Sequence, residues 1–184
     1  MKTRVVIFAT MLLATLLTSC SPKVYIVRGQ YDVSNSVTTS IPYDQVWNNI
    51  IDFFAENSIP IGTLSKDSGL ITASNISFED DIVSFEDENG FLVNKDAWFV
   101  VPYYSAPGAK LVGARATCSF NVRVRQIEDN QVKIQINLSN MVGYYNAEIL
   151  NTLTLKKEVI RNTFPRECQS TGRFETALLS LFQK

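Results

Sequence analysis

The chain has 184 residues, of which 46% are hydrophobic and 11% aromatic, and it carries a net charge of −1. This length suits one domain with a sizeable core, and the charge lacks the clustered basic surplus of a nucleic-acid-binding protein. Histidine is absent, which excludes histidine-dependent catalytic triads and two-histidine metal sites. We therefore expect a non-enzymatic protein with no catalytic residues, no cofactor, no metal site and no nucleic-acid partner.

Residues 1–19 have the organisation of an export signal. Lys2 and Arg4 precede an apolar run over residues 5–17, and small residues follow it. The run is shorter than the roughly 20 apolar residues that a membrane-spanning helix needs. We therefore expect a signal peptide. Its removal, which takes away two basic residues and no acidic one, would change the net charge from −1 to −3.

The end of this segment, Leu17-Thr18-Ser19-Cys20, resembles the lipobox of bacterial lipoproteins. The resemblance implies cleavage before Cys20, diacylation of its sulfur, and acylation of its new amino group by a fatty acid such as palmitate. Two or more chains on one residue anchor a protein stably to a membrane. A retained membrane-spanning helix and an ordinary signal peptide, with Cys20 as an unmodified cysteine, are the alternatives.

The residue after Cys20 bears on the destination of the protein. Ser21 resembles the outer-membrane sorting signal of enteric bacterial lipoproteins, and the chain lacks the acidic cluster that directs some lipoproteins to the cell surface. We therefore expect the protein to be anchored in the outer membrane through Cys20 and to face the periplasm.

The mature chain is expected to begin with a tether or first strand over residues 20–36, followed by a single α+β domain over residues 37–184. Ser40, Pro42 and Asp44 are helix start signals, and the apolar residues that follow recur at helical spacing. They predict a helix over residues 42–56.

The middle of the chain reads as a series of strands. Residues 59–64 and 70–76 predict two antiparallel strands joined by a turn, and residues 97–104 form an aromatic, apolar segment. The clearest alternation of apolar and polar residues covers 114–124 and resumes over 132–138. This period of two predicts a long hairpin with one buried and one polar face.

A second helix is predicted over residues 172–182, because its apolar residues recur at spacings of three and four. This order of elements predicts an α+β fold, in which an antiparallel β-sheet carries two helices packed on one face.

The first helix, the strand after it and the segment Lys66-Asp67-Ser68-Gly69-Leu70-Ile71 resemble the helix-grip domains of BamC-type lipoproteins. In that family a helix precedes a hairpin whose second strand follows an acidic Ser-Gly turn, and a C-terminal helix closes the sheet. The resemblance implies a helix-grip fold and a role as an accessory of outer-membrane barrel assembly, although BamC-type proteins usually hold two such domains and this chain has room for one.

Candidate functional residues fall into three groups. A possible surface for an envelope protein partner comprises Trp98, Phe99, Tyr103, Tyr104, Arg115, Arg123 and Arg125; burial of the aromatic residues and a merely solvated arginine face are the alternatives. Cys118 and Cys168 can form a disulfide in an oxidising periplasm or lie separately in the core. The acidic clusters at 79–81 and 86–88 lack the spacing of a calcium loop and read as solvated loop residues.

The sequence therefore predicts a lipid-anchored, non-enzymatic binding or scaffolding module of the cell envelope. The alternative is a carrier that holds a small apolar ligand in a helix-grip cavity. A packed interface between the sheet and the long helix favours the module, whereas an apolar cavity of several hundred cubic ångströms there favours the carrier.

Overall fold

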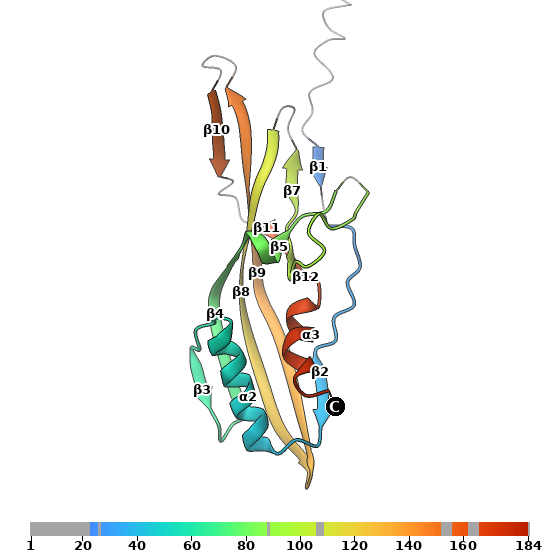
Figure 1. Ribbon diagram of the computed structural model, residues 1–184, viewed down its shortest axis with the longest axis vertical. Helices are drawn as coiled ribbons and strands as arrows, with labels where there is room; N and C mark the ends of the chain where they lie inside the picture. The colour runs from blue at the N-terminus through green and yellow to red at the C-terminus, as the bar shows by residue number, and fades with distance from the viewer. Residues whose placement is uncertain are drawn as a thin grey trace, which may run out of the picture.

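The computed structural model describes residues 23–25, 27–87, 89–105, 109–151, 156–161 and 166–183. It is an elongated structure of mostly antiparallel strands and two α-helices (Figure 1), which confirms the α+β class. Its elements, in chain order, are β1 (Lys23–Tyr25), β2 (Ser36–Thr39), α2 (Tyr43–Glu56), β3 (Thr63–Ser65), β4 (Leu70–Glu79), a 3-10 turn (Asp80–Ile82), β5 (Val83–Ser84), β6 (Phe99–Val100), β7 (Tyr103–Ser105), β8 (Ala109–Glu128), β9 (Gln131–Asn151), β10 (Lys156–Arg161), β11 (Arg166–Glu167), β12 (Gln169–Ser170) and α3 (Arg173–Ser180).

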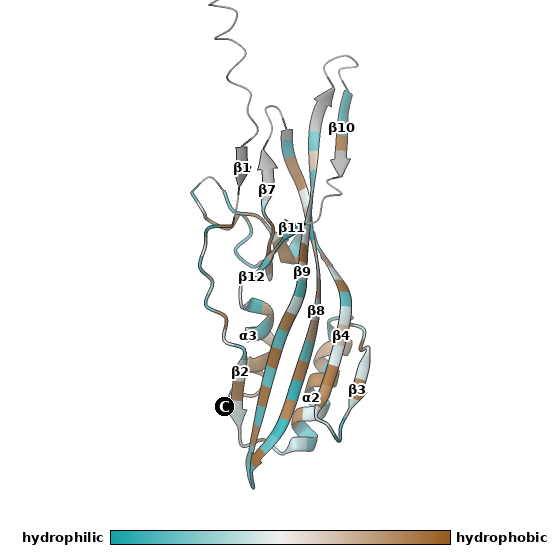
Figure 2. Ribbon diagram, turned by 180° about the vertical axis from the view of Figure 1, so that it is seen from behind, coloured by the Kyte–Doolittle hydropathy of each residue, from teal (hydrophilic) through white to brown (hydrophobic). Residues whose placement is uncertain are grey.

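The hairpin of β8 and β9 runs through the whole molecule. The two strands contain 20 and 21 residues, so at about 3.3 Å per residue each extends on the order of 65 Å. Its predicted alternation is confirmed: Val122, Val124 and Ile134 are buried, whereas Arg123 and Lys133 are exposed. The stripes of opposite hydropathy along both strands are visible from behind (Figure 2).

The largest sheet has the order β10-β9-β8-β4-β3, and β9 changes its outer neighbour along its length. On that edge β2 pairs with residues 132–135, β11 with residues 142–143, and β10 with residues 146–151. Two further sheets are smaller: β1 pairs with β7, and β5 and β12 flank β6.

Two bulges at the same level of the sheet explain why the strands extend further than expected. One extra residue of β4 lies opposite β8 near Asn75, and one extra residue of β9 lies opposite β8 near Asn140. Both asparagines have positive φ, 55° and 50°, a conformation that this residue type tolerates. Each bulge reverses the phase of burial, so the alternation breaks off although the strand continues.

The first helix is confirmed within one residue of its predicted start. Helix α2 begins after Pro42, carries Asp44 in its first turn, and ends at Glu56. The side-chain amide of the next residue, Asn57, donates to the Phe53 carbonyl at 2.8 Å. An acidic residue in a first turn and a terminal amide both satisfy the ends of a helix. Its buried stripe comprises Val46, Trp47, Ile50, Phe53 and Phe54.

Both helices contact the same ring of the hairpin. Phe120 on β8 lies 5.2 Å from Phe54 of α2 and 5.4 Å from Phe174 of α3, between ring centroids. Helix α3 is the predicted second helix, and Phe53 of α2 lies 6.2 Å from Phe174. These rings form the centre of the hydrophobic core.

The predicted strand over residues 59–64 is wrong for its first half. The Ile59 amide donates to the Phe54 carbonyl at 2.8 Å and its side chain is buried, so this residue closes the C-terminus of α2 and only β3 is extended. The predicted segment 97–104 is divided into β6 and β7, with Pro102 between them. Among the described residues, no helix has the length and apolarity to cross a membrane.

Candidate functional site

A groove lies on the outer edge of β9, where the sheet has a gap. Its volume is about 480 Å³, and we call it the β9 groove. Its lining comes from the segment before β2, from β9, from β11 and β12, and from α3; the residues are Val33, Asn35, Ile136, Asn137, Leu138, Met141, Glu167, Cys168, Gln169, Ser170 and Glu175. The groove therefore joins three segments that are far apart in the sequence.

The gap arises because two neighbours of β9 stop short of each other. The segment before β2 makes its last contact where the Ile136 amide donates to the Asn35 carbonyl at 2.9 Å. On the far side, the Cys168 amide donates to the Met141 carbonyl at 3.3 Å. Among the described residues, no strand pairs with residues 137–140 on this edge.

The acidic end of the groove is built by the start of α3. Glu175 is 2% exposed, and the Ser170 hydroxyl donates to its Oε2 at 2.8 Å. Burial raises the pKa of Glu175 above its ordinary range, and hydrogen bonds oppose that rise. Ser170 also accepts the Gly172 amide at 3.0 Å, so one hydroxyl connects the carboxyl group to the helix start.

Gly172 allows the N-terminal segment to lie against this helix start. Its φ is +82°, and a Cβ at this position would lie 2.6 Å from the carbonyl oxygen of Asp32. A larger residue would displace the chain that forms one wall of the groove, because both the conformation and the close approach require glycine.

A second buried carboxylate binds residues 28–31, which precede the segment that lines the groove. Glu86 is 4% exposed and accepts the amides of Arg28 at 2.7 Å and Gly29 at 2.9 Å, and the hydroxyl of Tyr31 at 2.6 Å. Burial, followed by the hydrogen bond and the charge of Glu86, raises the pKa of Tyr31. We call these four residues the Glu86 clamp, and they show that residues 28–31 are bound to the domain.

Two of the four aromatic residues of the predicted partner surface, Trp98 and Phe99, pack in the core or against it. Phe99 is fully buried on β6, the central strand of the sheet that β5 and β12 complete. Its assignment to an exposed surface is therefore wrong. Trp98 is half-buried, with its ring 5.1 Å from Phe174 and 5.9 Å from Phe78. Tyr103 and Tyr104 lie on β7, and their side chains lie outside the described part.

The three arginines of that surface are exposed but spread along β8. Arg115 lies over the ring of Tyr144, 4.7 Å from its centroid, and Arg123 and Arg125 lie nearer the turn of the hairpin. Ten residues of a strand extend about 33 Å, so Arg115 and Arg125 cannot meet one small partner group. The structure therefore does not bring the three arginines of the predicted surface together.

The two cysteines whose pairing the sequence could not decide are free thiols in the structure. Cys118 and Cys168 are both buried, and burial raises the pKa of each thiol to about 12. The charge of a Cys168 thiolate would raise the pKa of Cys118 further. Burial and a raised pKa are typical of a structural cysteine rather than of a reactive one.

The remaining predicted sites divide between described and undescribed residues. Cys20 and the signal segment lie outside the described residues. Of the acidic clusters, Glu86 forms the clamp, and Asp87 accepts the amides of Asn89 and Phe91 at 2.8 and 2.9 Å, so this part is structural. Within the described ranges, no group of three histidine, cysteine or acidic residues is placed to hold a metal ion.

Sequence analysis missed the groove, the clamp and the role of Glu175. Glu175 follows Ser170 by five residues, a spacing that no common motif marks, and Glu86 stood among other acidic residues. Comparisons with known protein families, with curated proteins and with solved structures found no match.

Proposed function

We propose that the chain is a lipid-anchored, non-enzymatic binding module of the cell envelope, held in the outer membrane through Cys20 and facing the periplasm. The tetrad Leu17-Thr18-Ser19-Cys20 supports the anchor and Ser21 supports the destination. The domain that follows offers a surface groove for another envelope component.

The observation that carries the proposal is how soon after Cys20 the chain is fastened to the domain. Only Ser21 and Pro22 separate Cys20 from β1, which pairs with β7, and the Glu86 clamp follows. Three residues extend at most about 10 Å. A lipid on Cys20 would thus hold β1 close to the membrane, where a long tether would leave the domain free to move away.

We further propose that the domain has a helix-grip arrangement, similar to that of BamC-type lipoproteins, with both helices on one face of the sheet. The contacts of Phe54 and Phe174 with Phe120 support it, because side chains that meet the same ring approach β8 from the same side. The role beside other outer-membrane proteins stays part of this proposal.

The filled interface of α2 favours the binding module over the carrier. Val46, Ile50 and Phe54 have no exposed surface, and they pack with Phe120 and Ile136 in the same core. The groove of about 480 Å³ lies instead at the outer edge of β9, so it presents sheet edge and helix start to a partner.

Membrane fractionation tests the proposal. Cells expressing the native chain are labelled with a clickable palmitate analogue, and membranes are washed with alkaline carbonate. We expect the native protein to be labelled and retained, and Cys20→Ala to lose both properties. Cys118→Ala is the matched control that keeps both. A Cys20→Ala protein that stays in the washed membranes would overturn the lipid anchor.

Destination needs a separate measurement. Ser21→Asp changes only the residue after the lipidated cysteine, and we expect it to move the labelled protein from the outer to the inner membrane on a sucrose gradient. Labelled Ser21→Asp protein that stays in the outer-membrane fractions would contradict sorting by this residue.

A further inference from the structure

We infer that the β9 groove binds an extended peptide segment of a partner protein, one that carries an apolar side chain and a basic one and adds to the free edge of β9 at Leu138. This inference rests on the proposed function, since it names the site and the chemistry through which the module would bind its partner.

The backbone of β9 provides the first argument. In an antiparallel strand, alternate residues present their N–H and C=O groups to the same edge. The Ile136 amide bonds to Asn35 on the outer edge, so Leu138, two residues further, presents its own N–H and C=O there. No described strand pairs with these groups, and an unpaired stretch of sheet edge is what an added peptide strand recognises.

The length of the gap sets the size of the segment. From Ile136 to Met141 the strand has five residue steps, one of which is taken up by the bulge at Asn140, so it advances by about four steps, or about 13 Å at 3.3 Å per residue. An extended tripeptide fits this interval. Hydrogen bonding of neighbouring segments to this edge of β9 stops at Asn35 on one side of the gap and at Cys168 on the other. A longer added strand would therefore collide with these segments.

The side chains of the groove define the chemistry of the peptide. Val33, Ile136, Leu138, Met141 and Cys168 give an apolar wall, and all of them except the exposed Val33 belong to the hydrophobic core or pack against it. This wall suits one aliphatic side chain of the added strand.

The charge of the groove selects the second side chain. Its two ionisable carboxyl groups belong to Glu167 and Glu175, and no lysine or arginine is among its lining residues. Glu175 is 2% exposed and lies at the α3 end. A lysine or arginine of the bound strand would pair with these carboxyl groups, and a charge-assisted bond in a buried site is stronger than one in water.

The experiment uses three dye-labelled tripeptides that differ in one feature each. They are acetyl-Val-Ala-Lys and acetyl-Val-Ala-Glu, whose first and third side chains point to the same face of an extended strand, and the lysine peptide with its central amide N-methylated. Binding to the purified lipidated protein in detergent is followed by fluorescence anisotropy. We expect the lysine peptide to bind at least tenfold more tightly than the glutamate peptide. N-methylation, which removes a strand hydrogen bond, should weaken binding about tenfold.

Matched protein variants locate the site. Val33→Arg places a cation at the rim of the groove, at a side chain that is 39% exposed, and should abolish binding of the lysine peptide. Leu64→Arg makes the same change at a 51% exposed leucine of β3, outside the groove, and should leave binding unchanged. Glu175→Gln, which keeps an acceptor for Ser170, should reduce the preference for the lysine peptide over the glutamate peptide to less than about threefold.

Equal binding of all three peptides would overturn the inference, and so would unchanged binding of the lysine peptide by Val33→Arg. The Cys20→Ala protein, freed of its lipid, should bind the lysine peptide as the native chain does. A native chain that carries palmitate but binds no peptide would refute the groove alone. A peptide-binding protein that carries no lipid would refute the anchor alone.

Discussion

Two halves of the β8–β9 hairpin have the same backbone structure and different surroundings. Helices α2 and α3 lie along residues 114–138, which we call the helix-packed half. At the other end β10 continues the ladder, and neither of the two described helices lies beside it (Figure 1). We call that end, residues 109–113, 144–151 and 156–161, the ladder half. Val122 and Val124 of the first half are 0% and 1% exposed, but Val112 and Val159 of the second are 43% and 60% exposed.

The comparison shows that strand pairing and core formation contribute separately to the stability of this hairpin. Valine favours strands in both halves, yet its side chain is buried only where helices pack against the sheet. We therefore expect the helix-packed half to determine global stability, and the ladder half to depend on backbone hydrogen bonds that open locally.

The largest test of this difference is Phe120→Ala. The ring contacts Phe54 and Phe174 and is 2% exposed, so its removal leaves a cavity between both helices and the sheet. We expect the free energy of unfolding to fall by about 3–5 kcal/mol, measured by urea denaturation followed by circular dichroism.

The matched changes in the ladder half are Val112→Ala and Val159→Ala. Both side chains are largely in water, so each should change the free energy of unfolding by no more than about 0.5 kcal/mol. A loss of more than about 2 kcal/mol in either would show that the two halves form one core and would remove the distinction.

The junction of the halves is tested by Gly143→Ala. A Cβ at this buried position of β9 would lie 2.6 Å from Cγ1 of Val101 and 3.1 Å from Cβ of Cys168. We expect a loss of about 1–3 kcal/mol from overpacking, measured by thermal denaturation. Val101→Ala removes the two close methyl groups, so the double variant should be more stable than the sum of the single losses predicts.

The sequence predicted α2, α3 and the helix-packed half well because their apolar residues keep one period where one face is buried. It ended β9 at Leu138 because the bulge at Asn140 moves the buried positions from even numbers, such as Ile136, to odd ones, such as Tyr145. Ile71 and Ala73 give way to Ile76 and Phe78 across Asn75 in the same manner.

The features that sequence analysis missed show no periodic pattern of apolar residues. Strand β10 reads Lys-Lys-Glu-Val-Ile-Arg, with too few apolar residues for a strand pattern, because its backbone pairing with β9 forms it. The β9 groove needs three distant segments to meet, and a gap between neighbours of a strand leaves no mark on the strand itself.

The Glu86 clamp extends the comparison to the N-terminal segment. Replacing Glu86 with Gln removes the charge that the amides of Arg28 and Gly29 and the Tyr31 hydroxyl share. We expect the local opening free energy of residues 28–31 to fall by about 1.5 kcal/mol, which makes hydrogen exchange of these two amides roughly tenfold faster. Asp87→Asn, which changes the neighbouring carboxylate, should leave their exchange unchanged.

The same clamp has a pH dependence of defined sign. The pKa of Tyr31 is raised above its ordinary value of 10.0 in the folded chain, so the stabilisation is complete below pH 10 and is lost as the pH rises above it. Exchange corrected for its intrinsic rate should therefore increase for residues 28–31 above pH 10. Tyr31→Phe should abolish this step, and a step that persists in Tyr31→Phe would assign it to another group.

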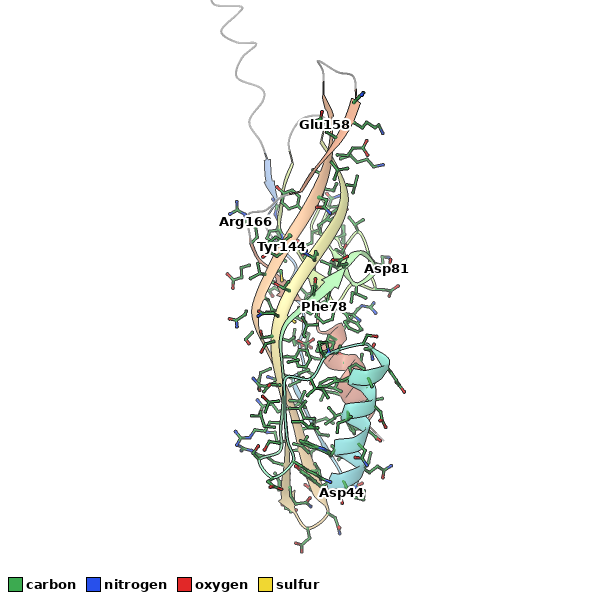
Figure 3. All side chains as sticks on the ribbon, turned by 90° about the vertical axis from the view of Figure 1, so that its left-hand side faces the viewer. Asp44, Phe78, Asp81, Tyr144, Glu158 and Arg166 are labelled. Atoms are coloured by element: carbon green, nitrogen blue, oxygen red, sulfur yellow. The ribbon has the colours of Figure 1, made fainter. Side chains whose placement is uncertain are left out.

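The smallest expected effect lies at the outer surface of the helix-packed half. Asp44, at the end of the molecule opposite Glu158 (Figure 3), pairs with Lys66 at 2.8 Å, and their side chains are 78% and 49% exposed. Asp44 also lies in the first turn of α2, where a negative charge is favourable. Asp44→Asn should lower the free energy of unfolding by about 0.5 kcal/mol or less, and Lys66→Met should lower it less, because it leaves the interaction of Asp44 with the helix intact. Adding 0.5 M NaCl should shrink both losses. If either loss instead exceeded that of Gly143→Ala, charges rather than packing against the helices would determine the stability of this half.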